Sequence, residues 1–246
     1  MRYKILVEYD GSKYVGWQKQ PDQPDKSIEE ILMNAIRDLT KQEVKINCAG
    51  RTDSGVHAIA QCADFAIDKH FDEEVIVRGL NRFLLGYDVS VTNCEIVDES
   101  FHSRYDAKAR IYEYRIINRS PKLALDQGRA WHVPLKLNVA AMHESGQFLI
   151  GLHDFSSFRD SNCQANTALR RVDKIEVVRQ GDLVTIKVEA KSYLHHMVRN
   201  IAGTLVLVGL GKMAVEEMAQ ILAAKDRTKS GRNAPACGLY FVEAVY

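Results

Sequence analysis

The chain has 246 residues, of which 46% are hydrophobic and 26% charged, with a formal net charge of +1. These proportions are typical of a globular protein with one large domain or two closely associated ones. No apolar stretch reaches the ~20 residues of a membrane-spanning helix, and the N-terminus lacks the pattern of a signal peptide, so we expect a cytoplasmic protein without membrane contact. The five scattered cysteines form no CxxC or Cys/His metal motif, which predicts reduced thiols and no metal site.

The first half of the chain alternates between strand and helix patterns. Ser27 and Glu30 form a capping box in front of an amphipathic helix. The predicted elements, in chain order, are a strand at 2–9, a helix at 27–41, strands at 44–48 and 59–66, a helix at 73–85 and a strand at 89–97. This βαββαβ order is that of a ferredoxin-like unit.

The second half repeats a similar order. Its predicted elements are a strand at 109–117, a helix at 137–151 capped by Asn138, a hairpin of 169–180 and 183–191 about Gly181, helices at 194–209 and 214–223, and a strand at 239–246. The polar segment 151–168 is a long insertion, which favours a functional loop. We therefore predict an α+β fold with two ferredoxin-like halves, 1–100 and 101–246. Their joined sheets would form a continuous, mostly antiparallel sheet with helices on one side and a central basic cleft.

Charge is unevenly distributed along the chain. Residues 68–99 hold eight acidic and three basic side chains, whereas residues 101–135 hold seven basic and three acidic ones. Tyrosines and a tryptophan interleave with this second stretch, and basic residues mixed with aromatic ones suit a nucleic acid.

The segment "AGRTDSGVHA" at 49–58 places a single carboxylate, Asp53, in a loop between glycines. An aspartate in such a loop often only closes an Asx turn. Arg51 in the same loop and Arg199 in the apolar stretch "YLHHMVRNIAG" offer a second interpretation, because either guanidinium would keep the carboxylate ionised as a nucleophile. No Walker, nucleophile-elbow or Rossmann motif is present. The adjacent His195 and His196 are expected to point in opposite directions.

"GRTDSGVHA" closely resembles the catalytic loop of the bacterial tRNA pseudouridine synthase A family. The likeness continues through "EYDGSKYVGWQKQ", "FHSRYDAKARIYEYRI", "HDFSSF", "SYLHHMVRNIAGTLVLVG" and "APACGLYFVEAVY". These motifs occur in the family's order along nearly the whole chain.

The resemblance implies a role for several residues. Asp53 matches the catalytic aspartate, Tyr112 the tyrosine that stacks on the target uracil, and Arg199 the basic partner of the aspartate. Leu239 matches an apolar residue near the base, and Arg51 a residue associated with RNA binding. To these we add four basic side chains as candidate phosphate ligands, namely Arg104, Lys108, Arg110 and Arg159.

The implied activity is isomerisation of uridine to pseudouridine at positions 38, 39 and 40 of the tRNA anticodon stem-loop. The family also implies a homodimer that binds tRNA and uses no cofactor. Two alternatives stay open at this stage: a non-catalytic RNA-binding module with a ferredoxin-like sheet, and a hydrolase that uses Asp53.

Overall fold

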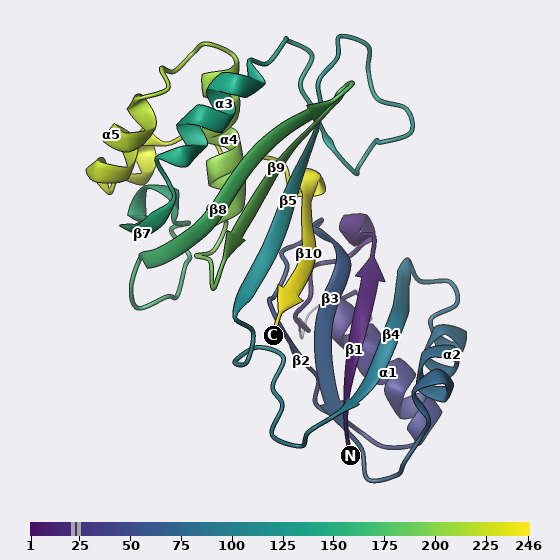
Figure 1. The fold of residues 1–246 in the computed structure, drawn as a ribbon. Helices are drawn as coiled ribbons and strands as arrows, with labels where there is room; N and C mark the ends of the chain where they lie inside the picture. The colour runs from purple at the N-terminus through teal and green to yellow at the C-terminus, as the bar shows by residue number, and fades with distance from the viewer. Residues whose placement is uncertain (21–22, 24–25) are drawn as a thin grey trace. The chain divides into compact units, whose positions relative to one another are not determined.

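The computed structural model describes residues 1–20, 23 and 26–246, and these residues fall into two compact units. Unit 1 comprises residues 1–110 and 241–246, and unit 2 comprises residues 111–240. The chain is α+β, and its strands pair mostly antiparallel (Figure 1). Among the described residues, no helix is long and apolar enough to cross a membrane.

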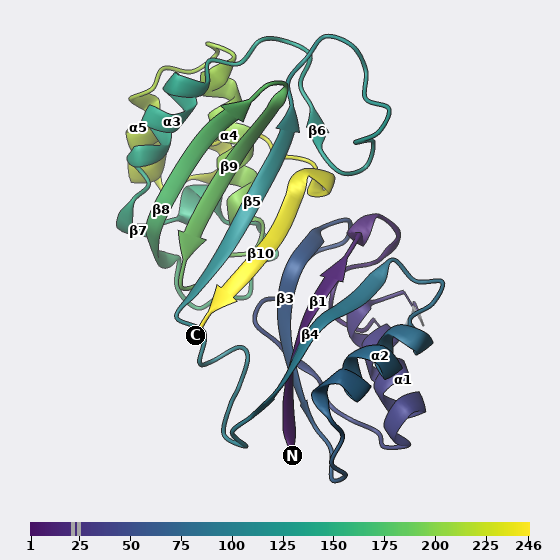
Figure 2. The same cartoon turned by 45° about the vertical axis from the view of Figure 1, so that its right-hand side comes forward.

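Unit 1 is built on antiparallel strands with two helices. Its elements are β1 (Arg2–Tyr9), α1 (Ile28–Thr40), β2 (Asn47–Cys48), β3 (His57–Ala66), α2 (Glu73–Phe83) and β4 (Val89–Val97). The strand order is β4-β1-β3, with β2 paired to β3. In Figure 2, α1 and α2 lie together beside these strands. The predicted βαββαβ order is confirmed for this part of the chain. Only Asn47 and Cys48 of the predicted strand 44–48 pair with β3.

Buried and less buried side chains alternate along β1, which gives the sheet one apolar face for the core. Every second side chain of β1 is buried, namely Tyr3, Ile5, Val7 and Tyr9. Successive residues of a strand face opposite sides of a sheet, so this pattern covers one face with apolar groups. The predicted cap of α1 is also confirmed, because Ser27 Oγ accepts a hydrogen bond of 3.2 Å from the Glu30 N–H.

Unit 2 contains a second set of strands and three helices. Its elements are the greater part of β5 (Ala109–Ile117), β6 (Trp131–His132), α3 (Val139–Gln147), β7 (Gly151–Asp154), β8 (Leu169–Gln180), β9 (Leu183–Ala190), α4 (Met197–Gly209) and α5 (Glu217–Ala224). The strand order is β5-β9-β8-β7, and β6 pairs with β5 in parallel. The last strand, β10 (Leu239–Val245), begins in unit 2 and continues into unit 1.

The predicted features of unit 2 are confirmed in part. Gly181 turns the β8–β9 hairpin with φ of +60°, and Asn138 Oδ1 caps α3 by accepting from the Ala141 N–H at 3.1 Å. The expected insertion 151–168 is partly regular, because residues 151–154 pair with β8 as β7. The pairing of Trp131 and His132 with β5 has no alternating pattern in the sequence and was not predicted.

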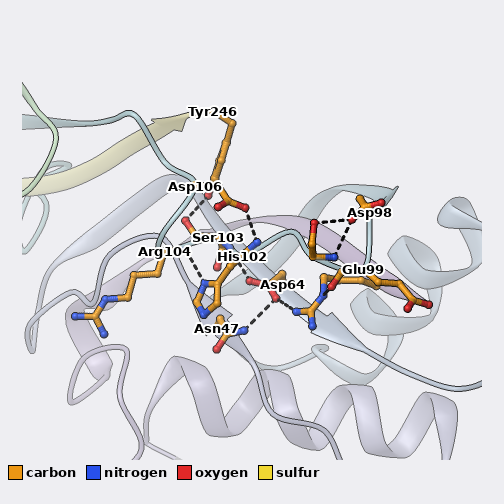
Figure 3. A network of polar contacts seen from close by, with 11 residues as sticks. Asn47, Asp64, Asp98, Glu99, His102, Ser103, Arg104, Asp106 and Tyr246 are labelled. Carbon is orange, nitrogen blue, oxygen red and sulfur yellow. Dashed lines mark hydrogen bonds and ion pairs between the residues drawn. The ribbon is translucent and has the colours of Figure 1, made fainter.

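Asp64 is a buried carboxylate that joins several segments of unit 1 (Figure 3). Its Oδ1 accepts from the Ser103 N–H at 2.8 Å, and its Oδ2 accepts from Asn47 Nδ2 at 3.0 Å and pairs with Arg2. Burial alone would raise the pKa of Asp64, but the hydrogen bonds from Ser103, Asn47 and Arg2 outweigh it and lower the pKa below its usual value. The carboxylate is therefore ionised in the folded protein and ties β1, β2 and β3 to the segment that follows β4.

Asp64→Asn removes this charge, and we expect it to lower the free energy of unfolding at neutral pH by about 1.5–3 kcal/mol. A carboxyl whose pKa is lowered on folding stabilises the protein above its unfolded pKa of about 3.9, and that stabilisation is lost as the pH falls through the folded value. Urea unfolding of both proteins at several pH values should therefore show a gap that closes on acidification. A gap that stays constant from pH 7 to below the unfolded pKa would contradict this assignment.

Candidate active site

The loop of residues 49–58 lies between β2 and β3, and buried groups hold its backbone. The Ala49 N–H donates to the Cys62 carbonyl at 2.8 Å, and Gln61 Nε2 donates to the Gly50 carbonyl at 2.6 Å. The Trp17 N–H donates to the Thr52 carbonyl at 2.9 Å. Backbone groups of Ala49, Gly50 and Thr52, which precede Asp53, are therefore all hydrogen-bonded.

The segment 10–17, which follows β1, packs directly on this loop. Gly16 forms an isolated β-bridge with Asp53 and has φ of +110°. A Cβ at Gly16 would lie 2.6 Å from the Thr52 carbonyl oxygen, and one at Gly11 would lie 1.9 Å from the carbonyl oxygen of Val56. Only glycine permits such close approaches. Sequence reasoning assigned no role to these glycines, although the spacing in "DGSKYVGW" is a signal for two tight turns.

The side chain of Thr52 points into the protein, between Arg51 and Asp53 in the sequence. Its hydroxyl shares a hydrogen bond of 2.7 Å with the Tyr9 hydroxyl, and its side chain is buried. Burial raises the pKa of Tyr9 far above its usual value, so this phenol stays protonated and available for the hydrogen bond. With Thr52 directed inward, Arg51 is exposed and Asp53 is half-buried. In this loop the guanidinium of Arg51 and the carboxylate of Asp53 therefore flank the buried side chain of Thr52.

Arg110 is used differently from the phosphate contact expected from the sequence. It is only 8% exposed, and its Nε donates to the Ala49 carbonyl at 2.9 Å and its Nη1 to the Ala107 carbonyl at 3.3 Å. Its Nη2 donates to the Arg104 carbonyl. These contacts make Arg110 a brace between the start of the 49–58 loop and the segment 104–107. Arg104 and Lys108, predicted with it, are exposed.

Unit 2 carries the remaining residues that the resemblance singled out. Tyr112, on β5, is 9% exposed and meets the Tyr193 ring edge-on, with ring centroids 5.0 Å apart. Arg199, in the first turn of α4, is half-buried and donates from Nε to the Ala234 carbonyl at 2.8 Å. Leu239 is buried at the start of β10. Each of these side chains is thus held by packing or by a backbone carbonyl.

The adjacent histidines do not point apart as expected. They precede α4, and their rings stack with centroids 3.8 Å apart. His196 has φ of +60°, and its Nδ1 lies 2.6 Å from Asp160 Oδ2. The Asn162 N–H, followed by His196 and His195, lowers the pKa of Asp160 against the effect of burial. Helical spacing does not apply to these two residues, because both lie before the first residue of α4.

Arg159 lies beside this cluster within the insertion 151–168. Its Nη2 donates to the carbonyl oxygens of Cys163 and Ala165 at 2.7 and 2.8 Å. Arg159 therefore joins two parts of the insertion, and its side chain is half-buried. Contact with RNA by Arg51, Arg104, Lys108 and Arg159 stays a prediction.

The chain resembles known proteins along its whole length. The family model described as tRNA pseudouridine synthase matches residues 5–106 and 147–246. The chain is 45% identical to "tRNA pseudouridine synthase A" of Paramagnetospirillum magneticum over 247 aligned residues, covering 100% of this chain and 95% of that protein. It is 44% identical to the proteins of the same name from Afipia carboxidovorans and Rhodospirillum centenum, covering 100% of this chain and 99% of each. The chain therefore belongs to the tRNA pseudouridine synthase family, a family of isomerases.

Proposed function

We propose that this chain converts uridine to pseudouridine at positions 38, 39 and 40 of the tRNA anticodon stem-loop, with Asp53 as the catalytic carboxylate. The observation that carries the proposal is the loop of residues 49–58. Buried contacts hold its backbone on both sides of Asp53, and the side chain itself remains half-buried. A carboxylate in a fixed loop is ready to meet a substrate without reorganisation.

The reaction is balanced by the uridine itself. The N1–C1′ glycosidic bond breaks, the uracil turns within the site, and a C5–C1′ bond forms while C5 loses its proton and N1 gains one. No atom is added and no oxidation state changes overall, so the step needs no external oxidant, reductant or group donor. Asp53 can attack C1′, attack C6, or take part in a glycal route, and all three require it to be ionised at the start.

The other residues act on the flipped base and on the carboxylate. Arg199 keeps the carboxylate ionised, Leu239 packs near the base, and the Tyr112 ring stacks on the uracil. A base removed from its stack costs a few kcal/mol, and stacking on an aromatic ring returns about 1–3 kcal/mol.

The proposed assembly is a homodimer in the cytoplasm that binds tRNA without a cofactor. Arg51, Arg104, Lys108 and Arg159 are the candidate phosphate contacts, since each has an exposed or half-buried guanidinium or ammonium group. The alternative, a non-catalytic RNA-binding module, predicts the same binding but no conversion. Measurements of turnover beside binding therefore separate the two.

Asp53→Asn should abolish turnover while leaving tRNA binding intact, because the amide keeps the shape of the carboxylate but cannot act as a nucleophile. We expect pseudouridine formation to fall by at least about a thousandfold and the Kd for tRNA to change by less than about threefold. Tritium release from [5-³H]uridine-labelled tRNA measures the first, and filter binding the second. The matched control is Asp68→Asn, an exposed aspartate after β3. Turnover retained by Asp53→Asn would exclude the catalytic assignment.

Tyr112→Phe keeps the ring that stacks on the base and removes only the hydroxyl. If the hydroxyl accepts or relays a proton, the single-turnover rate should fall by about a hundredfold or more, with little change in the Kd for tRNA. Tyr87→Phe, on an exposed tyrosine before β4, serves as the control. A single-turnover rate equal to that of the wild type would restrict Tyr112 to stacking.

Binding of tRNA should weaken steeply with salt, because cationic side chains that meet phosphates release counterions. Four phosphate contacts would lower the affinity by about a hundredfold between about 50 and about 200 mM salt. Filter binding across this range gives the slope directly. An affinity that does not change with salt would argue against a basic binding surface.

A further inference from the structure

The segment Phe101–Lys108, which we call the 101–108 loop, joins β4 to β5 in unit 1 and has no regular secondary structure. Buried groups nevertheless hold its backbone (Figure 3). The Ser103 N–H donates to the buried Asp64 carboxylate at 2.8 Å, and the Ser103 carbonyl accepts from the Tyr246 hydroxyl at 2.7 Å. The Arg104 carbonyl accepts from Arg110. The backbone of the loop is therefore hydrogen-bonded to three side chains that lie outside it, namely Asp64, Tyr246 and Arg110.

Hydrogen bonds within the loop fix its outer turn. The His102 N–H donates to Asp106 Oδ2 at 2.8 Å, and the Arg104 N–H donates to His102 Nδ1 at 3.1 Å. The N–H groups of Tyr105 and Asp106 both donate to the His102 carbonyl at 3.1 Å. These hydrogen bonds satisfy the backbone polar groups of an exposed turn, and one aromatic side chain lies at its tip.

That side chain is Tyr105, which is 72% exposed. His102 lies against its ring, with centroids 4.3 Å apart, and the Arg104 guanidinium lies 5.9 Å from the ring centroid. A single exposed aromatic residue is ordinary on a protein surface. Here it stands in a hydrogen-bonded turn with the exposed cation Arg104 near its ring, and Lys108, three residues further along the chain, is also exposed. The one carboxylate at the turn, Asp106, already accepts the His102 N–H.

This combination has the chemistry of a nucleotide contact. An aromatic face stacks on any base, and neighbouring cations hold the phosphates on either side of it. Neither group requires a particular sequence, and both can act at a distance from the reacting uridine. Apolar protein partners would instead favour a larger contiguous apolar patch than one tyrosine ring.

We propose that Tyr105 is a stacking platform for an unpaired base of the tRNA other than the reacting uridine, with Arg104 and Lys108 on the adjacent phosphates. The proposal rests on the proposed function, since tRNA is its ligand. Its purpose is to hold the RNA in register, so it contributes to binding and not to the chemical step. Arg110 and Asp64 act as positioning residues of this platform.

The test compares Tyr105→Ala, Tyr105→Phe and Arg104→Gln with Tyr87→Ala as the control for an exposed tyrosine in the same unit. Tyr105→Ala should raise the Kd for tRNA by about 5- to about 150-fold, the range of lost base stacking, with the salt slope unchanged. Tyr105→Phe should bind within about twofold of the wild type because it keeps the ring. Arg104→Gln should reduce the salt slope by about one. In the control Tyr87→Ala, both the Kd for tRNA and single-turnover conversion should equal those of the wild type.

Each outcome separates the platform from the catalytic proposal. Tyr105→Ala binding like the wild type overturns the platform, and so does a loss in Tyr105→Phe equal to that in Tyr105→Ala. Lack of tRNA binding by the wild-type protein also overturns it and favours a protein partner for this surface. Binding of tRNA without conversion overturns the proposed function instead, and the Tyr105 series then still decides the platform. A thermal unfolding midpoint of Tyr105→Ala equal to that of the wild type excludes a folding defect.

Discussion

The hydrogen bond between Tyr9 and Thr52 is the contact on which the geometry of the candidate site depends. It joins β1 to the centre of the 49–58 loop through two buried hydroxyls. A buried hydroxyl without a partner costs about 1–3 kcal/mol, so this pair strongly favours one orientation of the loop. On either side of the inward-directed Thr52, Arg51 is exposed and Asp53 is half-buried. The presentation of Arg51 and Asp53 thus follows from a neutral contact that takes no part in the chemistry.

Unit 1 uses its arginines in three distinct ways. Arg2 neutralises the buried carboxylate of Asp64, and Arg110 donates to backbone carbonyl oxygens. Arg104 is exposed beside Tyr105. A guanidinium carries five donors, which lets one residue type serve as ion partner, backbone brace or phosphate ligand. Counting positive charges along 101–135 therefore overstates the surface available for RNA, since Arg110 is taken up inside the protein.

Local patterns in the sequence predicted much of the fold. The alternation in β1, the N-cap at Ser27 and the turn at Gly181 each depend on neighbouring residues, and all three are present in the structure. The errors arise where distant segments decide the outcome. β6 exists only because Trp131 and His132 reach β5, and residues 44–46 stay outside β2 although Val44 and Ile46 are buried. The periodicity of the sequence predicts neither the pairing of β6 with β5 nor the exclusion of residues 44–46 from β2.

The same division applies to the candidate site. The motif around Asp53 identified the loop from adjacent residues alone. The contacts of Gly16 with Asp53 and of Arg110 with Ala49, which hold that loop, join residues far apart in the sequence. His195 and His196 show the reverse case, because a helical rule was applied to residues that lie before the helix. Short motifs therefore predict which residues matter, and tertiary contacts determine how they are held.

The central claim is that this chain rearranges uridine within an anticodon stem-loop. The most direct measurement is incubation of the protein with unmodified tRNA, followed by chemical labelling that maps pseudouridine at single-nucleotide resolution. The account predicts new pseudouridine at positions 38, 39 or 40 whenever uridine is present there. Tight binding of the same tRNA with every uridine unchanged would contradict it.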